Sequence, residues 1–457
     1  MRFRRTISPM AAGTHAGELR RELKLLDVAA IFVGIVLGSG IFVAPSAVAA
    51  AAPSTTAGAL LWIVGALVAA SGALCYAECG ARLPRTGGFY VFYREAFGPS
   101  VAFVGGWAAV LVTYPASIAA IALVLARYLG EIVPLGGTET AVAAAALLLA
   151  GLLNVAGVRI GAGTQKVLTT AKATALAALC VAAVASPRAP VPAAAPAGAG
   201  TGAAVLGALV VLLWTYDGWS DITLAAGEIR DPARNLGRAV LLGSATLAAL
   251  YVLVQVSVTT ALSPAVAAGS DRVVADAVEA GLGPAAGRLV AVVVVACTFG
   301  SIHGAILTAS RLGFAMARDG GLPAWFGGVH GASGTPARAT AGLVAAALAY
   351  VFAAGFRNLL AFFSFSVWIF YGMTAVALLV LRRRRVGEPL EWRAPGGPAA
   401  PAIVLATAVA MTAGLFLQDP GRSAIGLGLL LAGFPVYAAW KGVKEREAPQ
   451  KGRERTR

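Results

Sequence analysis

The sequence has little charge, little histidine and no cysteine outside its apolar runs. Only 12% of its 457 residues are Asp, Glu, Lys or Arg, about half the share found in soluble globular domains. Its three histidines, His15, His303 and His330, lie far apart in sequence, and no cluster with metal-ligand spacing is visible. The chain also lacks paired carboxylates of catalytic type and a nucleophile beside a base. These absences argue against a membrane enzyme, and we expect no metal or other cofactor.

All four cysteines, Cys75, Cys79, Cys180 and Cys297, fall inside apolar runs. A structural or intermolecular disulfide needs a cysteine in a loop, so we expect none. Cys75 and Cys79 share a helical face with no other soft metal ligand nearby, and we interpret them as packing residues.

Apolar residues are what the sequence has in excess. They make up 58% of the chain, and the mean hydropathy is +0.79. The apolar runs are about 20 residues or longer and lack strand-like alternation, so the spans are helices. The net charge of +15 is spread over short loops and tails, which favours a lipid bilayer rather than nucleic acid as the partner. The predicted fold class is an all-α, polytopic membrane protein.

Twelve apolar runs predict twelve transmembrane helices in two halves. The first half, 25–185, and the second, 203–381, are joined by an Ala/Pro-rich extracellular linker at 186–202. The other segments are a cytoplasmic tail (1–24), a cytoplasmic loop (382–396), two further spans (397–441) and a basic cytoplasmic tail (442–457). The spans lie near residues 25–50, 57–81, 99–129, 138–157, 164–185, 203–227, 238–262, 287–317, 337–356, 359–381, 397–417 and 422–441.

The basic residues predict the orientation. Most of the 36 Lys and Arg residues fall on the side of the two termini, which the positive-inside rule places in the cytoplasm. Residues 18–24 are predicted to form an interfacial helix. Residues 264–286 are predicted to form a short amphipathic helix that covers the pathway on the outer side.

Two of the spans are interrupted by residues that break a helix. Gly38-Ser39-Gly40 lies within the first span, where each glycine costs about 1 kcal/mol against alanine. Trp214–Asp221 interrupts the sixth span, which opens the second half. One small-residue motif alone also suits close helix packing, but breaks at corresponding positions of two halves indicate inverted repeats with a site near the bilayer midplane. Half-helix termini offer N–H groups to a carboxylate and carbonyls to an ammonium group, so the pair suits an amino acid.

Several motifs together resemble the L-type amino acid transporters of the amino acid/polyamine/organocation superfamily, over about 23–440. The resemblance implies a leucine-transporter-like fold of two inverted repeats of five helices, plus two peripheral helices. It is to bacterial members, which implies the cytoplasmic (inner) membrane of a bacterium. The motifs are Gly38–Phe42, Ala73–Glu78 with Pro84–Gly88, Tyr216–Trp219 with Glu228 and Asp231–Leu236, and Thr308–Arg311 with Ala317–Pro323.

The resemblance also implies that the substrate binds at the two breaks. N–H groups of residues 39–41 would bind its carboxylate, and carbonyls of residues 35, 36, 216 and 217 would bind its amino group. Trp219 would form a lid, although an aromatic residue within a span is as often a packing residue. The residues assigned to substrate binding are Ile35, Val36, Gly38, Ser39, Gly40, Ile41, Tyr216, Asp217, Gly218 and Trp219.

Ionisable residues inside spans are functional candidates by default, because burying them in a membrane is costly. Lys172 aligns with a family lysine that bridges the broken first helix and the eighth, near the cation site of sodium-driven relatives; the alternative is that it reaches the cytoplasmic boundary. Asp217 is predicted to cap the half-helix that follows it. The alternatives for Asp217 are selection of cationic side chains and protonation in a coupling cycle.

Four charged residues near cytoplasmic helix ends, Glu78, Arg85, Glu228 and Arg230, are candidates for ion pairs that close an inner gate. Ordinary solvated helix ends are an equally good interpretation. His303 lies alone in the eighth span and is predicted to be packed or hydrogen-bonded rather than a ligand.

The combined prediction is a sodium-independent transporter, an exchanger of small and medium-sized neutral L-amino acids that works by alternating access. Proton-coupled uptake and transport of cationic amino acids or polyamines are the alternatives, and no channel filter is visible. In animal relatives a cysteine between spans 3 and 4 joins a partner glycoprotein; residues 130–140 contain none, so we expect no disulfide-linked heavy chain. The sequence carries no signal for an oligomeric state.

Overall fold

The computed structural model describes residues 19–186, 199–353, 356–390 and 392–441, with the side chains of 356–365 and 418 excepted. Within these ranges the chain is helical, and its only β-type pairing is one isolated bridge. The α-helices are α1 (Leu25–Val36), α2 (Ala44–Ala51), α3 (Thr55–Arg82), α4 (Phe89–Phe97), α5 (Pro99–Ala108), α6 (Tyr114–Gly130), α7 (Glu139–Val155), α8 (Val158–Ala185), α9 (Gly202–Thr215), α10 (Pro232–Ala261), α11 (Pro264–Gly269), α12 (Val273–Leu282), α13 (Pro284–Arg318), α14 (Ala337–Ala353), α15 (Phe356–Arg384), α16 (Ala399–Gln418) and α17 (Pro420–Leu431).

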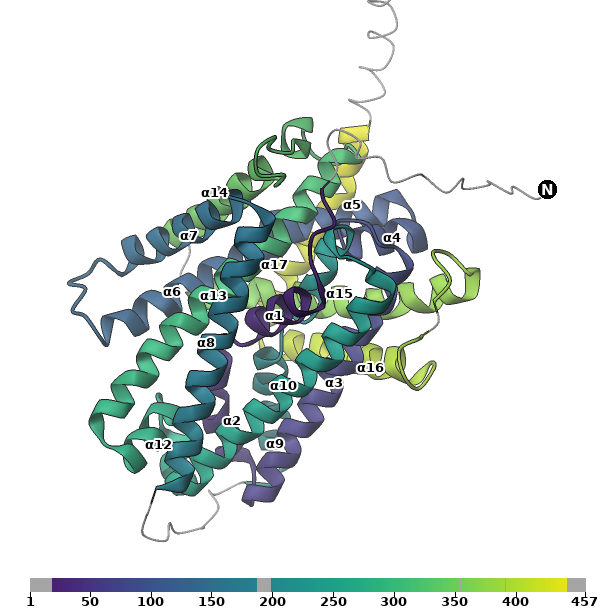
Figure 1. Ribbon diagram of the computed structural model, residues 1–457. Coiled ribbons are helices and arrows are strands. Elements are labelled where there is room, and N and C mark those ends of the chain that lie inside the picture. Colours follow the sequence, from purple (N-terminus) through teal and green to yellow (C-terminus); the bar gives the residue numbers. More distant parts are fainter. Residues whose placement is uncertain (1–18, 187–198, 354–355, 391, 442–457) are drawn as a thin grey trace, which may run out of the picture.

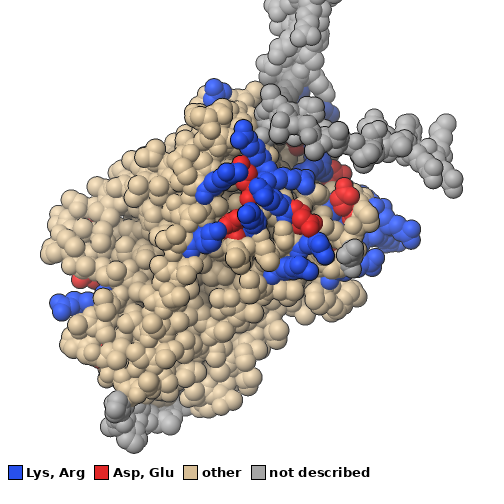
Figure 2. All heavy atoms as spheres, viewed as in Figure 1, with Lys and Arg blue, Asp and Glu red and all other residues tan. Residues whose placement is uncertain are grey.

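Eight of the helical segments are long and apolar enough to cross a membrane. Four shorter apolar helices, α1, α7, α9 and α14, lie where four further spans are predicted. In Figure 2 the charged side chains in view gather mainly on one region near the N-terminal end, while most of the visible surface carries none. The class of polytopic α-helical membrane protein is confirmed, and the count of twelve spans stays a prediction.

Both predicted helix breaks are present. Helix α1 ends at Val36 and is followed by the 3-10 helix η1 (Gly40–Phe42) and then by α2. Helix α9 ends at Thr215 and is followed by the 3-10 helix η3 (Asp221–Glu228). Figure 1 shows α1 near the centre of the molecule, and it packs against α8, α10 and α13. The broken helices therefore lie inside the bundle rather than at its edge.

The segment before α1 differs from the predicted interfacial helix. Residues 19–24 are not helical, and Leu23 forms a parallel bridge with Ile229. The Leu23 N–H donates to the Glu228 carbonyl at 3.0 Å, and the Arg230 N–H donates to the Leu23 carbonyl at 2.9 Å. These bonds tie the start of α1 to the end of η3, because each strand-like segment satisfies backbone groups that the other leaves free.

The predicted outer helix at 264–286 is two helices, α11 and α12, with α13 already beginning at Pro284. The helix is interrupted at Ser270, whose hydroxyl accepts a hydrogen bond from the Arg272 N–H at 3.1 Å and also bonds Asp276. A serine side chain that bonds nearby backbone in this way competes with the helix. The predicted linker at 186–202 and both predicted tails lie largely outside the described residues.

The predicted third span is not a uniform helix. A five-residue π-helix, η2 (Ala109–Thr113), lies between α5 and α6, and Pro115 follows it in the first turn of α6. Proline lacks an N–H group, so the helix cannot keep its regular bonding one turn earlier. Single π-helical turns of this kind occur often at functional sites.

Helices α3 and α10 pack against each other through a buried aromatic group. The Trp62 indole N–H donates to Gln255 Oε1 at 2.8 Å, and the Trp62 ring lies edge-on to Tyr216 and Tyr251, with ring centroids 5.9 and 5.3 Å away. Trp62 is completely buried. This group connects α3 and α10 to the break after α9.

We predict that Trp62→Phe lowers the free energy of unfolding by about 1–3 kcal/mol, because Gln255 Oε1 loses its donor in a buried place. The measurement is the apparent melting temperature of the purified protein in detergent. Trp325→Phe is the control, since Trp325 is 52% exposed. Equal shifts in the two variants would contradict the role given to Trp62.

Candidate functional site

The two breaks contact each other directly. A Cβ on Gly40 would lie 2.9 Å from the Thr215 Cα, so only glycine permits this approach. Gly218 has a φ of +96°, and a Cβ there would lie 2.7 Å from the Ile35 side chain. Both glycines are thus required by the backbone, and together they bring the ends of α1 and α9 to one place.

The carbonyls at the end of α1 are satisfied by side chains from other helices. Lys172 of α8 is buried, and its Nζ donates to the carbonyls of Gly34 and Leu37 at 2.7 and 2.8 Å and to that of Cys297 at 3.2 Å. The Ser301 hydroxyl donates to the Ile35 carbonyl at 2.9 Å. Lys172 therefore joins α1 to α13, and its ammonium group does not extend to the cytoplasmic boundary.

The carbonyl of Val36, the last residue of α1, also accepts hydrogen bonds. The Tyr251 hydroxyl donates to the Val36 carbonyl at 3.1 Å, and the Gly38 N–H donates to the same carbonyl at 2.8 Å. The first residues after the break show the opposite situation. No acceptor among the described residues pairs with the N–H groups of Ser39, Gly40 and Ile41. Consecutive free N–H groups in such a turn form a concave site for an anion.

Two neighbouring hollows open beside the breaks. The first, which we name the turn hollow, has an empty volume of about 590 Å³ and includes Gly38, Ser39 and Gly40 in its lining. The second, the aspartate hollow, has an empty volume of about 610 Å³ and includes Asp221 and Tyr114. The hollows form one site because they share the lining residues Ile35, Ser117, Ile121, Asp217 and Ser301.

Two carboxylates face this site. Asp217 lines both hollows, and its side chain accepts a hydrogen bond from the Tyr371 hydroxyl of α15. The N-cap position of η3 is Ser220 rather than Asp217, and the side-chain hydrogen bond of Asp217 joins it to α15 instead of capping the following half-helix as predicted. Asp221 lines the aspartate hollow, where its Oδ1 accepts from the Tyr114 hydroxyl at 3.0 Å.

Asp221 was not among the predicted site residues, although it belongs to the Trp214–Asp221 stretch. The signal for it was the one already applied to Lys172 and Asp217, an ionisable residue inside a span. Ser301 and Tyr371 carried no comparable signal, because a serine or tyrosine in a span is common. Their place in the site depends on how α13 and α15 pack.

Three of the predicted binding residues, Ile41, Tyr216 and Trp219, are absent from the lining of the two hollows. The Trp219 ring packs on Tyr76 and Tyr371, with centroids 5.3 and 4.0 Å away, and its role as a lid stays a prediction. Trp219 directly follows Gly218, whose positive φ lies in the turn between α9 and η3. Trp214, before the turn, lines the turn hollow instead.

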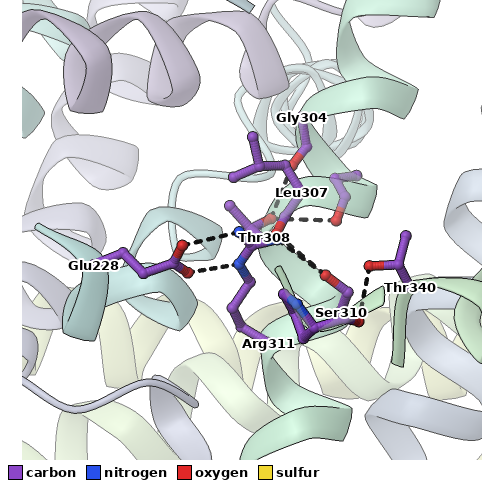
Figure 3. A network of polar contacts seen from close by, with 9 residues as sticks. Glu228, Gly304, Leu307, Thr308, Ser310, Arg311 and Thr340 are labelled. Carbon is purple, nitrogen blue, oxygen red and sulfur yellow. Dashed lines mark hydrogen bonds and ion pairs between the residues drawn. The ribbon is translucent and has the colours of Figure 1, made fainter. Parts of the chain in front are cut away.

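The four gate candidates divide into two buried carboxylates and two exposed arginines. Glu228 is buried against Arg311 of α13, with Nε–Oε1 and Nη2–Oε2 distances of 2.7 and 3.0 Å; Figure 3 shows both hydrogen bonds of this ion pair. Arg230 is exposed, and its Nε donates to the carbonyl of Arg21. Arg85 is exposed and pairs with Glu95.

Glu78 holds a second buried ionic group at the end of α3. Its carboxylate pairs with Arg82 at 3.0 Å and with Arg382 of α15 at 2.6 Å. It also accepts the Ala394 N–H at 2.7 Å. Glu78 and Glu228 therefore form buried ion pairs that connect helices, and they do not lie at solvated helix ends.

His303 is hydrogen-bonded, as predicted. Its Nδ1 lies 2.9 Å from Gln165 Oε1, and its carbonyl accepts from the Asn154 side chain at 3.1 Å. In the described part of the chain no group of three His, Cys, Asp or Glu residues is placed to hold a metal ion.

Comparison with known proteins gives a consistent result over almost the whole chain. A family model described as amino acid permease matches residues 23–437. The chain is 31% identical to the b(0,+)-type amino acid transporter 1 of Mus musculus, over 83% of this chain and 81% of the relative. It is also 31% identical to the large neutral amino acids transporter small subunit 2 of Mus musculus (94% and 83%) and of Homo sapiens (94% and 82%).

We predict that Glu228→Ala lowers the free energy of unfolding by about 3–5 kcal/mol, because Arg311 is left as a buried, unpaired charge. The apparent melting temperature in detergent measures the loss. Glu22→Ala is the matched control; its partner Arg159 has a side chain that is 77% exposed, and exposed pairs contribute at most about 1 kcal/mol. If the Glu228→Ala protein were as stable as the control, the buried ion pair between Glu228 and Arg311 would not stabilise the fold.

Proposed function

The chain belongs to the amino acid permease family, and we propose that it is a sodium-independent exchanger of small and medium-sized neutral L-amino acids that works by alternating access. It is a multi-pass membrane protein whose relatives are transporters rather than enzymes. The family membership supports amino acid transport. The finer statements are argued below from the site.

The observation that supports substrate binding best is the row of free N–H groups at Ser39, Gly40 and Ile41. Ser39 and Gly40 line the turn hollow and Ile41 follows them at the same helix break, so an amino acid carboxylate there would find N–H donors that no described residue satisfies. Asp217 lines the same hollow and would offer a counter-charge to the α-ammonium group. A carboxylate and an ammonium group on one carbon are the features that all amino acids share.

Lys172 supports sodium independence. The carbonyls of Gly34, Leu37 and Cys297 converge on its Nζ, and carbonyl oxygens of this kind are also what a sodium ion would need as ligands. The ammonium group of Lys172 supplies a positive charge at this place. We infer that transport needs no sodium because the Lys172 ammonium group occupies the place where a sodium ion would bind these carbonyls.

Neutral substrates are favoured by the rest of the turn hollow. Its walls include Ile35, Val36, Ala120, Ile121 and Val124, which suit small or medium apolar side chains. The four cysteines are all buried, so we propose that the chain works without a disulfide-linked heavy chain.

Proton-coupled uptake is the second candidate. The observation that favours it is that Asp217 and Asp221 face the site with hydroxyl donors as their recorded side-chain partners. A buried carboxylate without a cation takes up a proton readily, and a proton that enters with the substrate would drive net uptake.

We expect purified protein in liposomes loaded with unlabelled leucine to accumulate labelled leucine in sodium-free buffer, at a rate at least tenfold above that of empty liposomes. The physical reason is that the empty carrier reorients slowly, while substrate binding favours the state that crosses. Equal uptake into empty liposomes that rises with an inward proton gradient would favour proton coupling. No uptake of any amino acid would refute the proposed function.

We predict that Lys172→Ala lowers exchange at least tenfold while the protein still folds, because α1 loses its bond to α13 at the break. Exchange rate and apparent melting temperature are measured on the same preparation. Lys166→Ala is the control on the same helix; Lys166 pairs with Asp27 and its side chain is 47% exposed. Wild-type exchange in Lys172→Ala would remove the bridging role.

A further inference from the structure

We propose that a groove between α15, α16 and α17 binds one anionic phospholipid, with an acyl chain in the groove and the phosphate at the arginines that end α15. This site shares no lining residue with the turn hollow or the aspartate hollow, and it goes beyond the proposed function. Its support comes from the lining of the groove, the arginines at its end and the position of α15.

The groove is lined by apolar residues along its whole length. Apart from Thr412, the described residues that line it are aliphatic, aromatic, methionine or glycine. Its empty volume is about 1350 Å³, including the open space in front of it. On α16 the lining runs from Leu405 to Leu417, a rise of about 18 Å along the helix. One leaflet of the hydrocarbon core is about 15 Å deep, so the groove suits an extended acyl chain.

The face of α15 that lines the groove leads to a cluster of arginines. Ile369, Met373 and Val376 line the groove. Steps of three and four residues continue the same helical face through Val380 to Arg383. The arginine side chain therefore lies where the apolar face of the helix ends, as a lipid headgroup does above its acyl chains.

Arg384 marks the same end of the groove. Its Nη1 donates to the Ala96 carbonyl at 3.1 Å, and the next residue, Phe97, lines the groove. Residues 383–385 are three exposed arginines, and in the described part of the chain they form no ion pair. A phospholipid phosphate would supply the negative charge and the acceptor oxygens that these guanidinium groups bind well.

The arginines also argue against two other occupants of the groove. An uncharged lipid or a sterol would bring no negative charge to them. A second copy of this chain in the same membrane would have the same orientation. In a symmetric contact its own arginines would then face these at the same depth and repel them.

Helix α15 separates the groove from the aspartate hollow. Val367, Phe370 and Tyr371 line the aspartate hollow, while Trp368 and Ile369 line the groove. The rings of Trp368 and Tyr371 are in contact, with centroids 5.4 Å apart. A lipid in the groove therefore packs on a helix whose opposite face lines the aspartate hollow, and we expect the lipid to speed amino acid exchange. This last expectation alone rests on the proposed function.

The test measures lipids retained by the purified protein in native mass spectrometry, with phosphatidylglycerol and phosphatidylcholine of equal chain length supplied in equal amounts. We expect one phosphatidylglycerol to be retained with about tenfold preference, because arginines at the membrane surface attract anionic headgroups. Arg383→Gln combined with Arg384→Gln should abolish this preference. The matched control is Arg234→Gln combined with Arg238→Gln, since both arginines are exposed on α10.

Ala413→Trp tests the groove itself. Ala413 is exposed and lines the groove, so an indole ring there would take the place of the acyl chain and lower the retention of both lipids. Ala410→Trp is the control, because Ala410 is exposed on the same helix but does not line the groove. Apparent melting temperatures show which variants are folded.

Equal retention of the two lipids by the wild type would overturn the inference, and so would an equal loss of preference in the control pair of arginines. Unchanged retention in folded Ala413→Trp would also overturn it. A dimer that dissociates in Ala413→Trp would show instead that the groove is an interface between copies.

The effect on transport is measured as leucine exchange in phosphatidylcholine vesicles with and without phosphatidylglycerol. We expect phosphatidylglycerol to raise the wild-type rate at least twofold and to leave the rate of the Arg383→Gln, Arg384→Gln protein unchanged. If the lipid binds but the wild-type rate is the same in both vesicles, the link through α15 fails. If no amino acid exchanges in either vesicle while the lipid binds as expected, the proposed function fails and the lipid site stands.

Discussion

The structure depends on how backbone polar groups are satisfied where two helices stop inside an apolar bundle. An unpaired N–H or C=O group in such a place costs several kcal/mol, so the break after α1 survives only because side chains of other helices reach it. Lys172, Ser301 and Tyr251 take up carbonyls at the end of α1. The N–H groups of Ser39, Gly40 and Ile41 are left over, and Ser39 and Gly40 line the turn hollow.

The acidic residues inside the bundle also divide into two groups: those that form ion pairs between helices and those that line the cavity. Glu78 and Glu228 lie between helices and are matched by arginines with close contacts. Asp217 and Asp221 lie on the wall of a cavity and have hydroxyl groups as their side-chain partners. A buried ion needs a counter-ion, and the arginines supply it for Glu78 and Glu228. In the described part of the chain no arginine or lysine forms an ion pair with Asp217 or Asp221.

Helix breaks were predictable from the sequence because Gly38, Gly40 and Gly218 are local signals that act on their own stretch of chain. The same holds for the apolar runs and for the lysine at position 172. The surroundings of Trp219 could not be predicted for a non-local reason, because its ring packs on Tyr76 and Tyr371, which come from other helices. The predicted interfacial helix at 18–24 was wrong for a comparable reason, since Leu23 instead pairs with Ile229, over 200 positions away.

The sequence by itself determined that the chain is a helical membrane protein, that its first and sixth spans are broken, and to which family it belongs. These properties follow from composition and short motifs, which need no knowledge of neighbours. The tertiary structure decided which residues share the cavity. Asp221, Tyr114, Ser301 and Tyr371 meet there because η3, α6, α13 and α15 converge on the break. That convergence is a matter of packing between distant segments, and it alone distinguishes a carboxylate that holds helices together from one that lines the cavity.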